Sequence, residues 1–193
     1  MEYLGALIIG GMTGNYLSNG GKINKIKTLW ILCAVVISMG VHSICVYQFT
    51  DKTSYLIFYL TSVLLLTIGY KDYRELLVPM DLIIVGGVLG LYLNMTLPAL
   101  GGWINLVSAL VTLLLLGALS RISRGGFGEG DAYVMALIGL FYGGMYVLIL
   151  GMMALIMSGV FSLICLIFGK ANRKTLLPFV PFIAAAHLFL IWV

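Results

Sequence analysis

The chain has 193 residues, of which 62% are hydrophobic and only 9% charged, with a formal net charge of +4. About a quarter of the residues of a soluble domain are charged, so this composition excludes a soluble protein and indicates an integral membrane protein. The Lys and Arg residues are scattered in small groups between apolar runs, which excludes a basic stripe for nucleic acid. At about 20 residues per helical span, we expect an all-α, polytopic protein with about eight transmembrane helices in one domain over residues 1–193.

The predicted helices follow the apolar runs. Glu2 stands where a signal peptide has a basic segment, so we expect the first run to be a retained helix. Residues 132–168 contain no charge; they are too many for one span and too few for two, so the turn at 142–144 is expected to separate a short helix from a full one. In chain order, we predict helices over residues 3–18, 28–47, 54–69, 79–97, 103–119, a short helix from 132, a helix ending near 168 and a last helix over 175–193.

The basic residues predict the topology. If the loops alternate between the two sides of the bilayer, all Lys and Arg residues except Lys52 lie on one side. Short loops rich in Lys and Arg stay in the cytoplasm. We therefore expect both termini outside, and Asp72 and Asp131 together on the cytoplasmic face.

Two aspartates on one face indicate a possible acid-base pair. When two carboxylates lie a few ångströms apart, one is held protonated and the other can act as general base on a water molecule. This chemistry needs no metal or cofactor, and we predict neither. Simpler roles stay open: Asp131 follows a glycine and precedes an apolar run, as a helix N-cap does, and Asp72 lies among charges that fit a solvated loop.

Other candidate sites are weaker. The glycine-rich run 125–130 lacks a Gly-Lys-Ser/Thr ending and Rossmann spacing, so it does not indicate a nucleotide site. His42 and His187 lie far apart in apolar segments, and we expect hydrogen-bonded packing residues instead of metal ligands. The three cysteines lack CxxC spacing, so we predict neither a zinc site nor a disulfide.

Several motifs resemble the type IV prepilin peptidases, and together they extend over most of the chain. Gly128-Glu129-Gly130-Asp131 resembles the GxGD motif of that family, and the helix after it, with Ala136 to Gly139 and Gly143, is similar to the family's following helix. Asp72 with Pro79 seven residues later, and Asp81 soon after, resembles the other aspartate motif. The segments 178–182 and 10–17 are similar to a C-terminal proline-phenylalanine segment and to a first-helix segment.

The resemblance implies an aspartic endopeptidase of the bacterial cytoplasmic (inner) membrane that removes the short basic leader of prepilins or pseudopilins at the cytoplasmic face. Asp72 and Asp131 would form the catalytic dyad, supported by Pro79 and by Gly128 and Gly130, which we expect to bend the backbone sharply and bring the short helix close to its partner.

Two features depart from the family. Many members carry an insert with two CxxC pairs after the first helix; the short loop here predicts a peptidase without N-methyltransferase activity. Tyr133 stands where the family often has Lys, and neither Tyr133 nor Glu129 has an assigned role. The sequence leaves the oligomeric state and the choice of prepilin undetermined.

Alternatives remain at this stage. A presenilin or signal-peptide-peptidase-like intramembrane protease also uses GxGD, although the chain has no Pro-Ala-Leu motif. A small proton-coupled transporter would use carboxylates and glycine-rich helix entries as well. In a structural membrane subunit, both aspartates would be replaceable.

Overall fold

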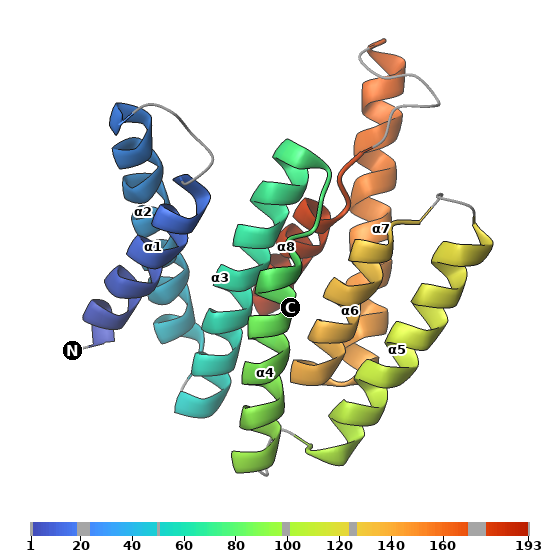
Figure 1. Cartoon of the computed structure of the whole chain (residues 1–193), viewed down its shortest axis with the longest axis horizontal. Helices are drawn as coiled ribbons and strands as arrows, with labels where there is room; N and C mark the ends of the chain where they lie inside the picture. The colour runs from blue at the N-terminus through green and yellow to red at the C-terminus, as the bar shows by residue number, and fades with distance from the viewer. Residues whose placement is uncertain are drawn as a thin grey trace. The chain divides into compact units, whose positions relative to one another are not determined.

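The computed structural model describes residues 2–18, 24–49, 51–97, 101–123, 127–169 and 177–192, and these residues form helices and connecting turns without any strand. This confirms the predicted all-α class. The elements are α1 (Glu2–Ser18), α2 (Asn24–Gln48), α3 (Lys52–Glu75), α4 (Met80–Thr96), α5 (Trp103–Ile122), α6 (Glu129–Tyr142), α7 (Gly144–Ile167), α8 (Val180–Phe189) and the 3-10 turn η2 (Leu190–Trp192) (Figure 1).

Three of the described helices, α3, α5 and α7, are long and apolar enough to cross a membrane, judged by length and composition. Helices α4 and α8 are apolar but shorter. These helices support a membrane protein, and the count of eight transmembrane spans stays a prediction.

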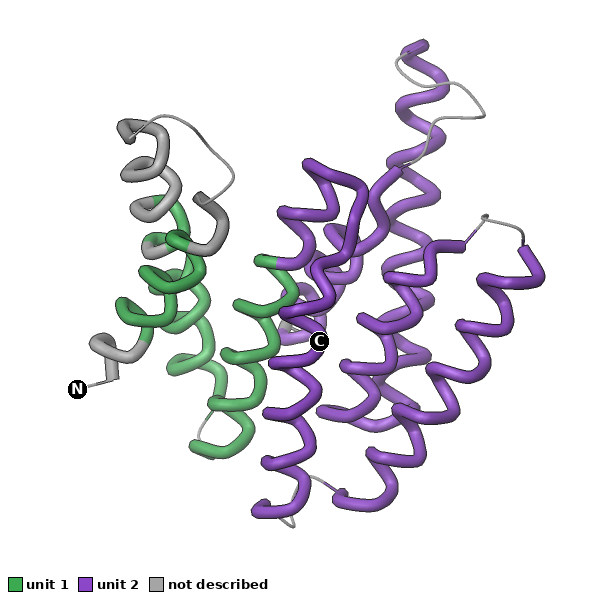
Figure 2. The backbone as a smooth tube through the Cα atoms, in the orientation of Figure 1, with its two compact units in different colours: residues 1–67 green, residues 68–193 purple. Residues whose placement is uncertain are grey.

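Two compact units divide the chain, residues 1–67 and residues 68–193, with the boundary inside α3 (Figure 2). In the first unit α1 packs against α2. The Ser38 hydroxyl, which is buried, donates to the carbonyl of Ala6 over 2.9 Å and is hydrogen-bonded to the Tyr59 hydroxyl. His42 is also buried and is hydrogen-bonded to the Tyr55 hydroxyl, which confirms the prediction of a hydrogen-bonded packing residue.

Helix α6 is the centre of the second unit. It packs against α4, α5 and α7 (Figure 1), and its side chains from Val134 to Phe141 are buried on all faces. A helix that is apolar all round and only 14 residues long can be stable here because its neighbours cover it. The predicted short helix is therefore confirmed, but it begins at Glu129 and not at residue 132.

Two other predicted boundaries differ most from the structure. Helix α3 continues past Gly69 to Glu75, so Asp72 lies in the last helical turns and not in a loop. The last helix begins at Val180, because Leu177 to Phe179 are not helical. In both places hydropathy located the change from apolar to charged sequence, whereas the backbone hydrogen bonds determine where a helix ends.

The predicted turn after α6 is confirmed at Gly143. Its φ of 81° lies in the left-handed region, which glycine adopts without steric cost. Two buried asparagines bind carbonyls that the end of α6 leaves without a helical partner: Asn94 Nδ2 donates to the Leu140 carbonyl over 2.7 Å, and Asn105 Nδ2 donates to the Phe141 carbonyl over 3.5 Å. The far end of α6 is thereby tied to α4 and α5.

We expect Asn94→Leu to destabilise the protein by about 1–2 kcal/mol, because a buried carbonyl of α6 loses its donor in an apolar setting. Thermal unfolding in detergent measures this loss. Thr96→Val is the matched control, since Thr96 is an exposed residue of α4 whose hydroxyl donates to the Tyr92 and Leu93 carbonyls of its own helix. Equal unfolding temperatures for the two variants would contradict the role of Asn94.

Candidate active site

Asp72 is nearly buried, with 6% of its surface exposed. Its Oδ2 accepts a hydrogen bond of 3.1 Å from the backbone N–H of Val180, the first residue of α8. The neighbouring N–H of Phe179 also interacts with this carboxylate. The described structure thus places Asp72 against the start of the last helix, which excludes the solvated-loop interpretation.

Asp131 is the third residue of α6, and the N-cap is Gly128. The interpretation of Asp131 as an N-cap is therefore wrong. Its side chain instead reaches back to the backbone N–H of Gly128, as the third residue does in one half of a capping box. The side chain is half-buried.

The charge state of Asp131 depends on its surroundings. Helix α6 is not one of the three candidate spans, and Asp131 lies in its first turn. Burial, and after it the negative charge of Asp72, raise the pKa of Asp131 to about 7, although a hydrogen bond from Gly128 opposes the increase. The two carboxylates therefore interact, although 59 positions separate them in the sequence.

The two motif glycines are needed for space and not for a sharp bend. Gly128 has an ordinary extended backbone, with φ −70° and ψ 135°, and Gly130 is helical. A Cβ at Gly128 would lie 2.8 Å from Oδ2 of Asp131, and a Cβ at Gly130 would lie 2.5 Å from Cγ2 of Val78. The expected close approach is thus confirmed, and the partner is the segment between α3 and α4.

This segment, residues 76–79, carries its own backbone features. Leu76 ends α3 in the left-handed region with φ 52°, which is uncommon for a residue with a side chain, and its N–H donates to the Asp72 carbonyl over 2.8 Å. Pro79 is the N-cap of α4, one position before the first helical turn in which it was expected. Both residues keep the segment short and Val78 close to Gly130.

The start of α6 is also tied to α5 and α8. The hydroxyl of Ser120 donates to the Phe127 carbonyl over 2.8 Å, and the Phe127 N–H donates to the hydroxyl of Ser123 over 3.1 Å. The Phe127 ring packs edge-on against the Phe179 ring, with 6.2 Å between the ring centroids. The ends of α3, α5, α6 and α8 therefore meet around the two aspartates.

A family model of the type IV leader peptidases matches residues 59–167, more than half of the chain. The chain belongs to the type IV leader peptidase family. No curated protein and no solved structure matches it. Both aspartates of this peptidase lie inside the matched range, whereas α8 lies beyond it.

Some residues of the peptidase remain outside the site or unassigned. Glu129 is exposed and Tyr133 is half-buried, and no contact within the described part of the chain gives either a role. His187 is fully buried and hydrogen-bonded to the Tyr146 hydroxyl over 2.8 Å, which confirms it as a packing residue. Within the described ranges, no three His, Cys, Asp or Glu side chains are grouped to hold a metal ion.

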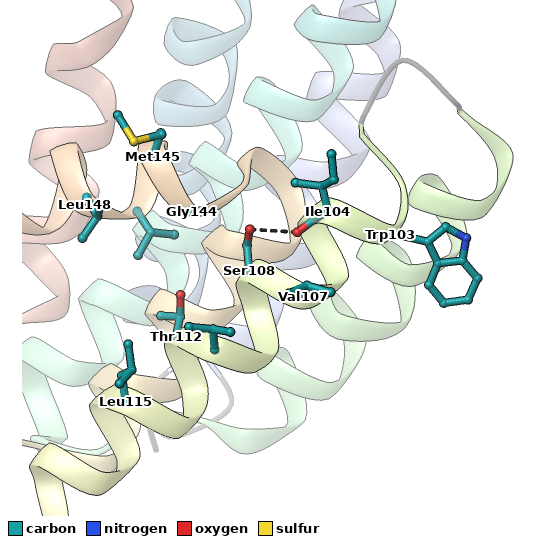
Figure 3. A pocket seen from close by; sticks show the side chains of 11 residues that line it. Trp103, Ile104, Val107, Ser108, Thr112, Leu115, Gly144, Met145 and Leu148 are labelled. Carbon is teal, nitrogen blue, oxygen red and sulfur yellow. Dashed lines mark hydrogen bonds between the residues drawn. The ribbon is translucent and has the colours of Figure 1, made fainter.

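An apolar groove of about 520 Å³ lies between the first halves of α5 and α7. Figure 3 shows Thr112, Gly144 and Met145 among its lining residues, with the Ser108 hydroxyl donating to the Ile104 carbonyl over 2.8 Å. Because α7 starts where α6 ends, the groove lies roughly 20 Å from Asp131, one length of α6. It is separate from the aspartates.

Sequence reasoning did not identify the donors on Asp72. Val180 and Phe179 act through their backbones, so their side chains carry no chemical signal. The only indication was the resemblance of the segment 178–182 to a family motif, and this resemblance did not show that the segment contacts Asp72.

Proposed function

We propose that this peptidase is an aspartic endopeptidase that removes the short basic leader of prepilin-like proteins, with Asp72 and Asp131 as its catalytic dyad. The observation that supports the proposal is that the ends of α3, α6 and α8 meet and carry two acidic side chains, Asp72 nearly buried and Asp131 half-buried. The charge of Asp72 also helps to raise the pKa of Asp131. Two such groups can share one proton at neutral pH.

The proposed reaction uses a water molecule bound by the dyad. The ionised carboxylate takes a proton from the water, and the water oxygen attacks the carbonyl carbon of the scissile peptide bond. The protonated carboxyl group donates to the carbonyl oxygen and stabilises the tetrahedral intermediate. When the C–N bond breaks, a proton passes to the leaving nitrogen and the dyad again holds one proton.

The position of the dyad fits a substrate whose cleavage site lies at a membrane boundary. Asp72 is near the end of a candidate span and Asp131 is at the start of α6. A prepilin-like protein has a basic leader followed by an apolar helix, so its leader junction could reach this level. We place the site on the cytoplasmic side of the bacterial inner membrane, following the distribution of Lys and Arg, and treat residues 1–193 as one peptidase domain.

The test is leader cleavage by the purified protein in liposomes. Full-length prepilin is added in detergent or co-reconstituted, and mass spectrometry identifies the new N-terminus. A single cut after the basic leader supports the proposal. Proton or solute flux without cleavage would instead establish a transporter, and cleavage within the apolar helix would establish a presenilin-like protease.

The raised pKa of Asp131 predicts a specific pH dependence. Below about pH 7 Asp131 is protonated and the dyad holds one proton; above that pH both carboxylates become charged and the acid is lost. We expect kcat/KM to fall on the alkaline side with an apparent pKa near 7, a value that belongs to the coupled pair. A rate that stays constant from pH 7 to pH 9 would contradict a shared proton.

A further inference from the structure

We propose that Val180 is a positioning residue of the active site: its backbone N–H, at the start of α8, orients Asp72 and holds it as the carboxylate, so that Asp72 is the general base and Asp131 the acid. This inference rests on the proposed function. It assigns the two roles and gives the last helix a part in the reaction.

The start of α8 has donors available for Asp72. The N-cap residue is Phe179, whose side chain cannot accept a hydrogen bond, and the second helical residue is Pro181, which has no N–H. The N–H groups of Phe182 and Ile183 donate to the Phe179 carbonyl. The Val180 N–H is therefore one of the first-turn donors that a helix does not use internally, and the carboxylate of Asp72 accepts its hydrogen bond.

Asp72 needs this partner because of its position in α3. It lies in the last helical turn, where the negative end of the helix dipole disfavours a carboxylate. The positive end of α8 faces it and offsets that effect. A nearly buried carboxylate is tolerated only when hydrogen bonds replace its water, and the Val180 N–H at the start of α8 supplies one such bond.

Gly69 sets the distance between α3 and α8. It precedes Asp72 by three residues, so both lie on the same face of α3. A Cβ at Gly69 would lie 3.3 Å from Cα of Pro181 and 3.4 Å from its nitrogen. Both neighbours are backbone atoms, so an added methyl group would displace the start of α8 by a few tenths of an ångström.

The surroundings separate the roles of the two carboxylates. Asp72 accepts a hydrogen bond of 3.1 Å from Val180 of another helix, whereas Asp131 reaches back to the N–H of Gly128 at its own helix start. The described start of α8, residues 177–183, contains no ionisable side chain. Among the described residues, the ionisable neighbours of Asp72 are Asp131 from α6 and, along α3 itself, Lys71, Arg74 and Glu75; Asp81 of α4 is exposed.

The experiment removes the Val180 donor alone. Incorporating the α-hydroxy acid analogue of valine at position 180 replaces the N–H with an oxygen and keeps the side chain. The matched control is the α-hydroxy analogue of isoleucine at position 183, whose N–H donates to the Phe179 carbonyl over 3.2 Å and not to Asp72. The measurement is the pH profile of kcat/KM for prepilin cleavage in liposomes.

In the protein with the analogue at position 180, we expect the acidic limb of the pH profile to move to higher pH by about one unit, because the Asp72 carboxylate has lost a donor that favours its charged form. The alkaline limb and the control profile stay in place. A uniform loss of rate with an unmoved acidic limb would show a purely structural role and overturn the proposal.

A second pair of variants covers the case in which the analogue does not fold. Gly69→Ala moves the start of α8 away from Asp72, and we expect a smaller shift of the acidic limb in the same direction. Gly87→Ala in α4, where nothing lies within 4 Å of the new Cβ, leaves the profile unchanged. If the wild type cleaves prepilin and the pH profile of a folded Gly69→Ala protein is unmoved, the inference alone is overturned. If the wild type cleaves at no pH, the proposed function is overturned.

Discussion

Asp131→Asn and Asp72→Asn are each expected to lower kcat for leader cleavage by about 10²–10⁴-fold, the usual contribution of a general acid or base. Asparagine keeps the size of the side chain but can neither take a proton from water nor lend one to the carbonyl oxygen. Each variant therefore leaves one carboxylate without its partner. Initial rates with prepilin in liposomes, at equal protein abundance, measure the effect.

Glu129→Gln is the matched control for these variants. Glu129 lies in the same turn of α6 and is an exposed acidic residue, so its replacement is expected to change the rate less than about twofold, as a screened surface charge does. Normal cleavage by either aspartate variant, with the protein folded, would rule out the dyad and would show that the aspartates have a structural role.

Gly130→Ala is expected to reduce kcat/KM by about 10²-fold, because a displacement of a catalytic group by about 1 Å costs that much. The new Cβ would lie 2.5 Å from Cγ2 and 2.7 Å from Cβ of Val78. Rotation of the valine side chain relieves only the first contact, so the start of α6 must move and carry Asp131 with it. Cleavage rate and thermal unfolding are measured on the same preparation.

The reciprocal change tests this explanation. Val78→Gly removes both contacting atoms, so the double variant Gly130→Ala with Val78→Gly is expected to recover part of the lost activity. Gly117→Ala in α5 is the control, since nothing lies within 4 Å of its added Cβ. If the double variant is no better than Gly130→Ala alone, the contact with Val78 is not the reason for glycine at position 130.

Much of the fold could be predicted because hydropathy and helix length are properties of composition. The order of the helices, the short helix in the middle and the turn at Gly143 all followed from apolar runs and glycine. The end of α3 at Glu75 and the start of α8 at Val180 did not, because a helix can extend beyond the apolar run or begin within it. Only backbone hydrogen bonds mark those ends.

The candidate site could also be predicted only in part from the sequence. Counting loop charges placed Asp72 and Asp131 on one face, and the charge of Asp72 contributes to the raised pKa of Asp131; the dyad itself stays a proposal. The reason for Gly128 and Gly130 was mistaken in part, because a sequence shows that a side chain is absent but not what would collide with it. The bond from Val180 to Asp72 joins residues 108 positions apart through a backbone group, and no residue type encodes it.

The asparagine ties at the far end of α6 have a consequence for the bilayer. With 14 residues, α6 is about 21 Å long, shorter than a hydrocarbon core of about 30 Å. Because Asn94 and Asn105 hold its end to α4 and α5, this helix cannot slide or tilt freely to match a thicker membrane. Because α4, α5 and α7 cover α6, Asp131 keeps its depth relative to the protein in membranes of different thickness.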